Sequence, residues 1–483
     1  MTTAYTKQYI NGEWIEGSSD KKVINYNPYT NEVLQEITSA NQDDLNAAYD
    51  SAERAQKEWA TLAPAQIQQY FDVLLQKMNE RKEDIMDWLV KESGSTKMKA
   101  QVEFQAAMAI VKESSSFPTR MQGAILPSNV AGKNNYVERS PKGVIGVIGP
   151  WNFPFHLALR TIAPAIATGN TVVVKPASDT PVTSGLIIGE LLEQAGFPKG
   201  VINVVVGRGS EIGDSFVTHP TPKLISFTGS TEVGSHIGEL AGKHIKDTAL
   251  ELGGNNAMLV LEDADIDKAV QAAAFGKYLH QGQICMSLNR IIVHESIYDQ
   301  FTSAFAEKVK SLKVGDPAEE DTVIGPVINQ DAVERIHKDV EDSVQQGAHQ
   351  LVSGEARGNL MEPIVLSNVT NDMPIAHNEI FGPVATVIKV GDEQEAIDVA
   401  NSSPYGLSGS VFTTDRYRGI EVAKQVETGM IHINDQSVND EAHVAFGGEK
   451  QSGIGRFGGE WALDKFTTVK WISVQSEYRT YPF

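Results

Sequence analysis

The chain of 483 residues contains a single cysteine, Cys285, and this scarcity sets the first limits on its structure. One cysteine cannot form an intramolecular disulfide, and structural zinc sites of the usual kind need several cysteines. A secreted protein rarely carries one unpaired thiol, so a reducing, cytoplasmic location is expected. Histidines and carboxylates also lack the spacing of metal ligands, and no metal site is predicted.

The sequence has no long apolar run and no excess of positive charge. Its N-terminus lacks the apolar segment of a signal peptide, and the most apolar stretch, residues 143–174, is interrupted by polar side chains and prolines. Lys and Arg number 41 against 62 Asp and Glu, which gives a net charge of −21. Neither a nucleic acid nor a membrane is therefore expected as a partner.

The length favours two to four domains, and the hydrophobic pattern changes along the chain. Residues 43–112 have the spacing of amphipathic helices. The clearest of these covers residues 45–59, where Asp43 and Asp44 are the candidate capping residues.

From Gly143 onward, short β-branched runs alternate with segments of helical spacing. Strands are expected at 144–148, 171–175, 201–206 and 224–227, and helices at 156–168, 183–195 and 210–218. Near-continuous apolar strands that alternate with helices indicate a parallel sheet covered on both faces. The sequence therefore predicts a doubly wound, Rossmann-like α/β domain, which binds its ligand at the carboxyl ends of its strands.

A second alternation follows Gly254 and predicts a second α/β domain. Its expected strands are 256–261, 290–294, 385–390 and 430–434, and its expected helices are 266–281 and 296–311. Two more strand-like segments, 134–140 and 464–474, lie outside both domains. They suggest a small β arm that pairs with another subunit.

Cys285 lies in the segment His-Gln-Gly-Gln-Ile-Cys-Met at residues 280–286. A lone cysteine is most often a small, buried, apolar residue. Here Gly282 and Gln283 suit a packed core poorly and predict that the thiol lies on a turn after the helix. Because a nucleophilic thiol needs such access, Cys285 is a candidate nucleophile.

Two other polar residues stand at expected strand ends. Glu251 precedes Gly253 and Gly254, which permit a turn between domains, and a carboxylate there can act as a general base on water. Asn152 follows the first strand of the first α/β domain, where its amide can donate a hydrogen bond to an oxyanion. A surface glutamate and a turn asparagine remain the commoner interpretations.

Glycines and a lysine follow other expected strands. Gly229 and Ser230 join a strand to a helix whose N-terminus can bind a pyrophosphate. Gly207 and Gly213 form a looser cluster that lacks the spacing of a dinucleotide fingerprint, and both clusters also fit plain turns. Lys175 ends the second strand, where an amine can bind ribose hydroxyls or a phosphate.

In this order, the motifs resemble those of the aldehyde dehydrogenase superfamily. The matching segments span roughly the whole chain and are 150–154, 175–178, 227–231, 251–254, 282–285, 379–383, and 446–448 with 452–456. Each segment is a weak signal alone, but the ordered set is specific.

The resemblance implies oxidation of an aldehyde to a carboxylate through a thioester on Cys285, with NAD and/or NADP as cofactor. Glu251 would be the base, and Asn152 would hold the oxyanion. The implied cofactor-binding residues are Ile148, Pro150, Trp151, Lys175, Ser178, Gly207, Gly213, Gly229, Ser230, Glu379 and Phe381. A homodimer or homotetramer is implied as well.

The resemblance also divides the chain into parts. Residues 1–122 and 142–251 would form the cofactor-binding domain, and residues 252–452 the catalytic domain. Residues 123–141 and 453–483 would form the oligomerisation arm and the C-terminal tail.

Finer features resemble benzaldehyde, vanillin and salicylaldehyde dehydrogenases, namely the segments 160–164, 280–286 and 479–483. An aromatic aldehyde is therefore the expected substrate, and an aliphatic aldehyde or a semialdehyde is the alternative. The implied substrate residues are mostly apolar: Phe153, Leu157, Arg160, Ile284, Met286 and Phe446.

Ser178 stands where members of the family that prefer NAD often carry glutamate, so the use of NADP as well as NAD is expected. This expectation requires that Asp179 caps a helix and so turns away from the ribose.

Other classes of protein fit these residues less well. A thiol hydrolase would need a histidine base beside Cys285, for which His280 is the nearest in sequence. A structural protein on a retired enzyme fold would not need an intact Cys285, Glu251 and Asn152. A CoA-acylating enzyme is disfavoured because Glu251 favours water as the acyl acceptor.

Overall fold

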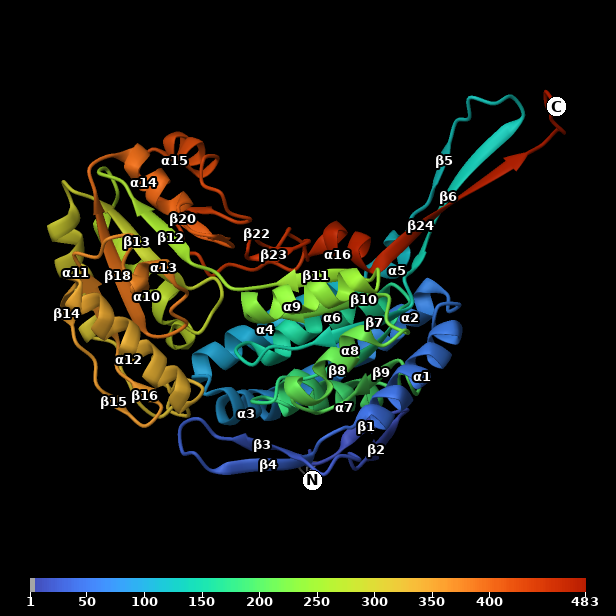
Figure 1. Ribbon diagram of the computed structural model, residues 1–483, viewed down its shortest axis with the longest axis horizontal. Coiled ribbons are helices and arrows are strands. Elements are labelled where there is room, and N and C mark those ends of the chain that lie inside the picture. Colours follow the sequence, from blue (N-terminus) through green and yellow to red (C-terminus); the bar gives the residue numbers. More distant parts are fainter. Residues whose placement is uncertain (1–4) are drawn as a thin grey trace.

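The computed structural model describes residues 5–483 and shows two α/β bodies side by side with a long β arm (Figure 1). The larger body is built on an 8-stranded sheet and the smaller on a 7-stranded sheet. The arm is a separate 3-stranded sheet that extends away from the larger body. The predicted fold class is confirmed.

The first sheet has the order β2-β1-β9-β8-β7-β10-β11-β23. Its central strands are parallel and comprise β7 (Val144–Ile148), β8 (Thr171–Lys175), β9 (Ile202–Val204), β10 (Leu224–Thr228) and β11 (Asp247–Glu251). The chain runs outward from β7 through β8 to β9 and then returns to the other side of β7 with β10. Ligands of such sheets bind where this order reverses, at the carboxyl ends of β7 and β10.

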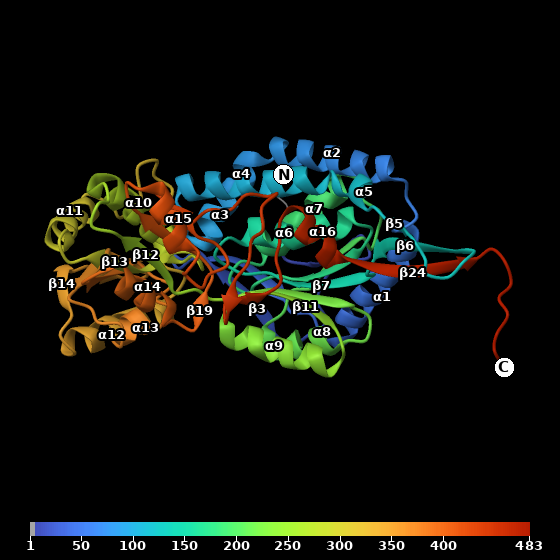
Figure 2. The same cartoon turned by 90° about the horizontal axis from the view of Figure 1, so that it is seen from above.

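Helices cover both faces of this sheet, as the uninterrupted apolar strands require. Val172 and Val174 of β8 pack into one core cluster, while Val173 between them packs into another. Figure 2 shows the two layers of helices above and below the sheet. The first cluster includes α2 (Pro64–Glu80), α3 (Lys82–Ser93), α4 (Lys97–Ser114), α6 (Pro154–Ala167) and α7 (Ile187–Gln194); the second includes α1 (Gln42–Trp59), α8 (Asp214–Thr218) and α9 (Thr231–Lys243).

The expected cap of the first helix is wrong by two to three positions. The N-cap of α1 is Asn41, whose side chain accepts hydrogen bonds from the backbone N–H groups of Asp43 and Asp44. Asp44 completes a capping box, because its carboxylate accepts the backbone N–H of Asn41.

Four further expected elements differ from the structure in detail. The helix expected at 266–281 is α10 (Ile266–Tyr278), because the backbone turns into the left-handed region at His280. The helices expected at 183–195 and 210–218 each begin with a π-helical turn, η1 (Val182–Leu186) and η2 (Gly209–Gly213). The strand expected at 201–206 is limited to β9.

The second sheet has the order β14-β17-β18-β13-β12-β20-β21. Its parallel strands are β12 (Asn256–Val260), β13 (Leu288–His294), β17 (Ile364–Ser367), β18 (Val384–Val390), β20 (Gly409–Phe412) and β21 (His432–Ile433), and β14 (His349–Val352) runs antiparallel at one edge. Its helices are α10, α11 (Tyr298–Lys310), α12 (Gln330–Gln345), α13 (Pro374–His377), α14 (Glu393–Asn401) and α15 (Arg416–Ala423). The order reverses between β12 and β20.

Short strands and turns complete the two bodies. They are β1 (Gln8–Ile10), β2 (Glu13–Ile15), β3 (Lys22–Tyr26), β4 (Val33–Thr38), β15 (Ala356–Arg357), β16 (Leu360–Met361), β19 (Tyr405–Gly406), β22 (Glu449–Lys450), β23 (Gly453–Ile454), α5 (Phe117–Arg120), η3 (Leu279–Gly282) and α16 (Gly459–Phe466). None of the helices in residues 5–483 is both long and apolar enough to cross a membrane.

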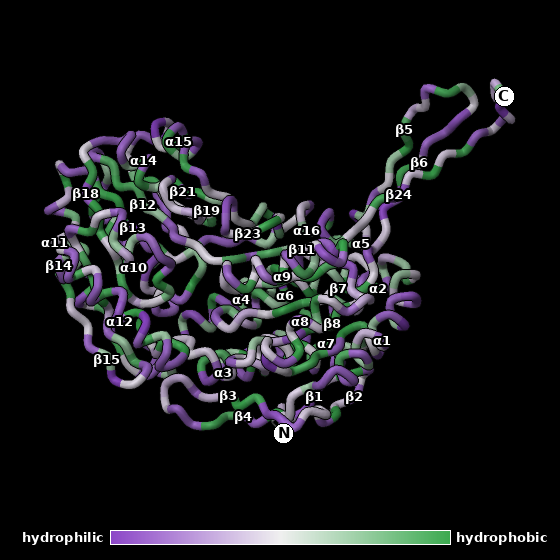
Figure 3. The backbone as a smooth tube through the Cα atoms, viewed as in Figure 1, coloured by the Kyte–Doolittle hydropathy of each residue, from purple (hydrophilic) through white to green (hydrophobic). Residues whose placement is uncertain are grey.

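The arm consists of β5 (Ala124–Leu126), β6 (Lys133–Pro141) and β24 (Thr467–Gln475) in the order β24-β6-β5. The strand expected at 464–474 begins at Thr467, because residues 464–466 end helix α16. The two predicted strands pair with each other, antiparallel over the whole of β24. Hydrophobic and hydrophilic residues alternate along the arm (Figure 3), and Val469 and Trp471 of β24 are 60% and 68% exposed. Pairing of β24 with another subunit stays a prediction.

Candidate active site

The three candidate catalytic residues come from opposite ends of the two sheets. Asn152 follows the carboxyl end of β7, and Glu251 is the last residue of β11. Cys285 precedes the amino end of β13 in the second sheet. Carboxyl ends of the first sheet thus meet amino ends of the second where the two bodies join.

An unusual backbone carries Cys285. His280, Gln281 and Gly282 have φ values of +50°, +58° and +74°, so the chain leaves α10 abruptly. Such a conformation is strained for residues other than glycine, and the surroundings must hold it. The Gln281 side chain does so by donating to the carbonyls of Gly94 and Pro326, at 3.1 and 2.7 Å.

The main chain of Cys285 is fixed by Asn256, which sequence reasoning did not single out, and by close packing against Gly254. The Asn256 amide donates to the carbonyls of Cys285 and Ser287 at 2.7 and 2.8 Å. A Cβ atom at Gly254 would lie 2.2 Å from the Cys285 carbonyl oxygen, so only glycine fits there. The close contact between Gly254 and the Cys285 carbonyl therefore helps to fix the position of the cysteine.

The Cys285 thiol is half-buried, and part of the residue remains accessible. Burial raises the pKa of this thiol to about 12, and the Glu379 carboxylate adds to the effect. The Arg160 guanidinium and the backbone N–H of Met286 oppose it. The thiol is therefore protonated at neutral pH and needs a base or an added positive charge to react.

Asn152 is buried and linked to the cysteine loop. Its amide Nδ2 donates to the carbonyl of Gln283 at 2.9 Å, two residues before Cys285. An amide NH₂ group has two hydrogens, and the bond to Gln283 uses one of them. The other can donate to an oxygen atom bound beside the thiol.

Glu251 is 3% exposed, and neither carboxylate oxygen has a hydrogen-bond partner within residues 5–483. Burial raises the pKa of this carboxyl to about 8, while Arg160 and Arg456 oppose the shift. A buried carboxylate without partners is costly in a folded protein and is typical of a general base.

Arg160 is the polar member of the expected substrate residues. Its guanidinium lies over the ring of Phe446, 3.7 Å from the ring centroid, and Nη2 forms an ion pair with Asp440. Nε and Nη1 of Arg160 are buried without a hydrogen-bond partner in the described chain. The apolar members are all buried: Phe153, Leu157, Ile284, Met286 and Phe446.

Asp440 was missed by sequence reasoning, because no motif marks it. It binds Arg160 and also lies 3.2 Å from Nε2 of His156. Burial acts to raise the pKa of Asp440, but Arg160 and His156 outweigh it and lower the pKa to about 2. Asp440 is thus an ionised partner that holds Arg160 beside Phe446.

The expected cofactor residues gather at the carboxyl ends of the first sheet and at one loop of the second body. Strand β7 ends at Ile148 and is followed by Pro150 and Trp151, and β8 ends at Lys175. The turn between β10 and α9 contains Gly229 and Ser230. Ser230 is the N-cap of α9, and a Cβ atom at Gly229 would lie 2.4 Å from the Phe227 ring. Gly207 follows β9, while Gly213 ends η2 in open space.

Lys175 shows that these residues suit a polar ligand. Lys175 is 5% exposed, and its ammonium makes a long hydrogen bond of 3.5 Å to the carbonyl of Pro176. Burial lowers the pKa of Lys175 to about 8, and Glu211 and Asp179 oppose this. An amine so buried and so weakly bound fits the ribose hydroxyls of a dinucleotide, and the N-terminus of α9 fits its pyrophosphate.

Glu379 and Phe381 approach from the second body. The Glu379 carboxylate accepts the backbone N–H of Gly254 at 2.9 Å, and burial raises its pKa to about 7. Phe381, at φ +49°, meets Trp151 edge-on at 5.5 Å. The fully buried Lys277, which the motifs did not indicate, acts on Glu379 electrostatically.

The expected cap by Asp179 is wrong. The N-terminus of η1 is bound instead by Glu92 of α3, whose carboxylate accepts the N–H groups of Val182 and Thr183 at 2.9 and 2.8 Å. Asp179 is exposed, and Arg208 and Lys175 are the cations that act on its carboxylate. A carboxylate at this strand end therefore remains beside Ser178.

His280 does not serve as a base for the thiol. Its ring is fully buried, meets Phe153 edge-on at 5.7 Å, and both ring nitrogens lack a hydrogen-bond partner among residues 5–483. Burial, with Lys99 nearby, holds its pKa well below the usual range. The geometry that a thiol hydrolase requires is not formed.

Comparison with known proteins agrees with this geometry. The sequence model of the aldehyde dehydrogenase family matches residues 14–472. A benzaldehyde dehydrogenase of Bacillus subtilis is 50% identical over 99% of this chain and 98% of its own length. A vanillin dehydrogenase of Corynebacterium glutamicum is 52% identical over 97% of this chain and 98% of its own. The crystal structure of an NAD-dependent benzaldehyde dehydrogenase from Corynebacterium glutamicum superposes with a TM-score of 0.91, at 48% identity, and covers 99% of this chain and 98% of that one.

Proposed function

The chain belongs to the aldehyde dehydrogenase family, and we propose that it oxidises an aromatic aldehyde to the carboxylate through a thioester on Cys285. The observation that carries the proposal is the meeting of three groups at the junction of the two sheets. The Asn152 amide donates to the loop that carries Cys285. The Glu251 carboxylate, which has no hydrogen-bond partner in the described chain, is close enough to the Cys285 thiol to raise its pKa.

The first half of the reaction forms the thioester. Cys285 releases its proton to solvent water, and the thiolate attacks the aldehyde carbon, which gives a tetrahedral alkoxide. The second hydrogen of the Asn152 amide donates to this oxygen, and loss of one such donor typically costs roughly 10²–10³-fold in rate. A bound nicotinamide dinucleotide would supply the hydride acceptor. Collapse of the alkoxide leaves an acyl group on the Cys285 sulfur.

The second half releases the acid. Glu251 takes a proton from water, the resulting hydroxide attacks the thioester carbonyl, and the Cys285 thiolate leaves. The raised pKa of Glu251 suits this role, since a base near the working pH is both ionised often enough and strong enough. Neither of its oxygens has a hydrogen-bond partner in the described chain, so both remain available to accept a hydrogen bond from water.

An aromatic substrate is proposed on two grounds. The candidate substrate residues include Phe153 and Phe446, and the Arg160 guanidinium lies over the ring of Phe446. Two relatives with at least half of the aligned residues identical are a benzaldehyde and a vanillin dehydrogenase. Aromatic rings stack well on such a surface, whereas a short aliphatic aldehyde would fill less of it.

NAD is the proposed cofactor. Lys175 and the N-terminus of α9 would hold the adenosine ribose and the pyrophosphate, and Glu379 the second ribose. The Asp179 carboxylate beside Ser178 would repel the 2′-phosphate of NADP. Use of NADP as well remains a prediction, now with one of its premises removed.

Trapping of the acyl-enzyme tests the mechanism. The Glu251→Gln variant, mixed with benzaldehyde and NAD and quenched in acid, should gain the mass of one benzoyl group, and peptide mapping should locate it on Cys285. Cys285→Ala is the matched control and should gain nothing. A benzoyl group on another residue, or none in the presence of a burst of NADH, would contradict the proposal.

The same proposal includes an assembly and a location. Because β24 stands at the edge of the arm with Val469 and Trp471 exposed, we expect it to pair with a second copy of the chain in a two-fold dimer or a tetramer. A monomeric mass in light scattering at micromolar concentration would contradict this. The unpaired Cys285 suits the cytoplasm.

A further inference from the structure

A lysine and a glutamate are fully buried beneath the loop that carries Asn152. Lys99 and Glu103 lie one turn apart on α4, both 0% exposed, and their side chains form an ion pair. Helix α4 packs along α6, which begins directly after this loop. Neither residue belongs to a motif that indicated the function.

All three N–H donors of the Lys99 ammonium are in use. One binds Glu103, one binds the Ser95 hydroxyl at 2.9 Å, and one binds the backbone carbonyl of Asn152 at 2.6 Å. The ammonium also lies 4.1 Å from the centroid of the Phe153 ring. Charge-assisted hydrogen bonds of this kind are roughly twice as strong as neutral ones.

Glu103 binds the backbone that follows the same loop. Its Oε1 accepts the backbone N–H groups of Phe155 and His156 at 2.9 and 3.2 Å. These are among the first N–H groups of α6, which have no partner inside the helix. Phe153 is the N-cap of α6 and has no side-chain acceptor, so Glu103 takes the place of a capping residue.

We propose that Lys99 and Glu103 are positioning residues that hold the Asn152 amide in place for the alkoxide. The ammonium fixes the carbonyl of Asn152, the carboxylate fixes the N–H groups that follow, and the bond to Gln283 fixes the amide itself. Since an error of about 1 Å in such a group can cost roughly 10²-fold in rate, this clamp acts on the chemical step. The proposal rests on the thioester mechanism above.

The test variant removes both charges together. Lys99→Met alone would leave a buried, unpaired glutamate and can unfold the protein. Lys99→Met/Glu103→Gln is neutral, keeps the volume, and keeps an amide oxygen for the N–H groups of Phe155 and His156. The ammonium that donates to the Asn152 carbonyl and to the Ser95 hydroxyl is then lost, while the acceptor for the first N–H groups of α6 is kept. Circular dichroism and the Kd for NAD check that the variant is folded.

A double-mutant cycle with Asn152→Ala separates positioning from stability. In the wild-type background, the double variant should slow the NADH burst with benzaldehyde by roughly tenfold, a part of the 10²–10³-fold that an oxyanion donor supplies. In the Asn152→Ala background, the same change should cost less than about twofold, because groups that act through one another are not additive. An equal loss in both backgrounds overturns the proposal. An Asn152→Ala variant as fast as the wild type instead overturns the oxyanion role of Asn152.

A second ion pair outside the candidate site provides the control. Arg81 Nη1 lies 2.6 Å from Glu190 between α3 and α7, and both side chains are mostly buried. Arg81→Met/Glu190→Gln should lower the melting temperature and leave the burst rate unchanged in both backgrounds. A burst slowed as much as by the Lys99 and Glu103 changes would mean that general loosening explains the effect and would overturn the proposal.

Discussion

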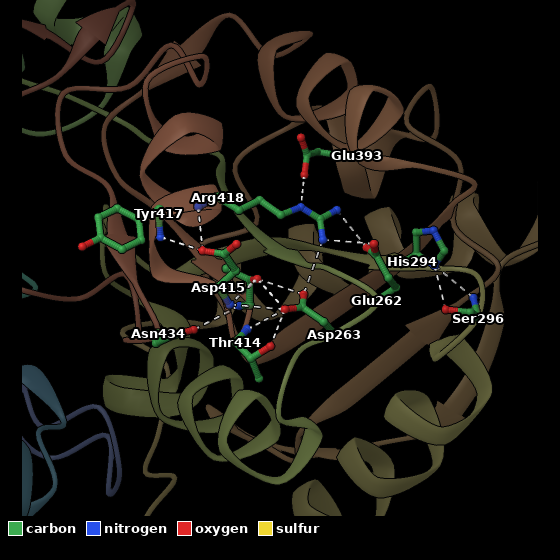
Figure 4. Close-up of polar contacts among 11 residues, drawn as sticks. Glu262, Asp263, His294, Ser296, Glu393, Thr414, Asp415, Tyr417, Arg418 and Asn434 are labelled. Carbon is green, nitrogen blue, oxygen red and sulfur yellow. Dashed lines mark hydrogen bonds and ion pairs between the residues drawn. The ribbon is translucent and has the colours of Figure 1, made fainter.

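The two ends of the second sheet differ in whether the polar groups around them have hydrogen-bond partners. At the amino end, beside Cys285, the buried oxygens of Glu251 and two nitrogens of Arg160 have no hydrogen-bond partner in the described part of the chain. At the carboxyl end, charged groups are joined in one network (Figure 4). The end of the second sheet that faces the first body thus lies beside unpaired polar groups, which the first body contributes, and is called the open end; the opposite end is called the closed end.

Arg418 is the centre of the closed end. Its guanidinium lies 2.5 Å from Glu393 and 3.0 Å from Glu262, and it also reaches Asp263 at 3.7 Å. Asp263 follows β12 and binds Thr413 and Thr414, which follow β20 (Figure 4). This is where the strand order reverses and where open α/β sheets commonly bind ligands. In this protein, side chains fill that position.

A surface cavity of about 570 Å³ lies beside the network, and most of its polar lining residues form hydrogen bonds or ion pairs. The N-terminus of α10 is capped by Asp265, and that of α15 by Asp415. A helix N-terminus already bound to a carboxylate has little attraction left for an anion. In this protein, the candidate site is therefore marked by buried polar groups without partners and not by the shape of a sheet end alone.

Loss of the thiol should have the largest effect on activity. Cys285→Ala should reduce NADH formation from benzaldehyde by at least roughly 10⁴-fold, because no covalent intermediate can form. The Kd for NAD, measured by fluorescence, should change by less than about threefold. Since the chain has no other cysteine, one equivalent of an alkylating agent should have the same effect on the wild type. Substantial turnover by the variant would disprove the thioester mechanism.

Glu251→Gln should have the next largest effect, about 10²–10⁴-fold on the steady-state rate. The amide cannot take a proton from water, so a burst of NADH should be followed by slow turnover in rapid mixing. The pH dependence gives a sharper test. Burial raises the pKa of Glu251 to about 8, so its ionised form increases as the pH rises through about 8 and is lost below that. Deacylation should follow this curve in the wild type and become nearly independent of pH in the variant.

The sequence predicted the sheets well because their signal is local. The strands at 144–148 and 171–175 were placed to the residue, since buried parallel strands read as continuous β-branched runs. The candidate catalytic residues were predicted from motifs in a fixed order. What could not be predicted are contacts between residues far apart in sequence. Lys99 binds a carbonyl 53 residues away, and Arg160 binds Asp440 280 residues away.

The structure also differs where a side chain elsewhere replaces a local one. Asp179 stood at the position of a helix cap, yet Glu92, 90 residues from Val182, occupies that position. Local sequence shows which residues can cap a helix but not which distant carboxylate is packed against its end. The departure of the chain from helix at His280 is similar, because its strain is balanced by bonds from Gln281 to distant carbonyls.

Asp440→Asn tests whether the ion pair with Arg160 at the open end contributes to substrate binding. The amide keeps the shape of Asp440 but removes the charge that holds Arg160 over Phe446. We expect kcat/KM for benzaldehyde to fall by roughly tenfold to a hundredfold, because a displaced Arg160 disturbs the surface on which the ring lies. The value for a short aliphatic aldehyde should fall less. An equal fall for both aldehydes would show that Asp440 does not act through substrate fit.

Asp179→Asn should shift the choice of cofactor by about tenfold, or roughly 1.4 kcal/mol. With the carboxylate neutralised, Arg208 and Lys175 are free to attract a 2′-phosphate, so binding of NADP should improve relative to NAD. Calorimetric Kd values for both cofactors measure this without turnover. Ser178→Glu is the opposite control and should weaken NADP binding. If Asp179→Asn leaves both Kd values unchanged, another group sets the preference.

Arg418→Met should have the smallest effect on activity, because it changes only the network at the closed end. Removal of the guanidinium leaves Glu262, Asp263 and Glu393 near one another without their shared cation. Arg418 is 30% exposed, so water screens part of the loss, and the free energy of unfolding should fall by about 1 kcal/mol. Because the network faces away from Cys285, kcat/KM for benzaldehyde should stay within about twofold of the wild type. Calorimetry and steady-state kinetics on the same preparation measure both quantities. A tenfold loss of activity with little loss of stability would mean that the closed end communicates with the thiol, and the distinction between the two ends would fail.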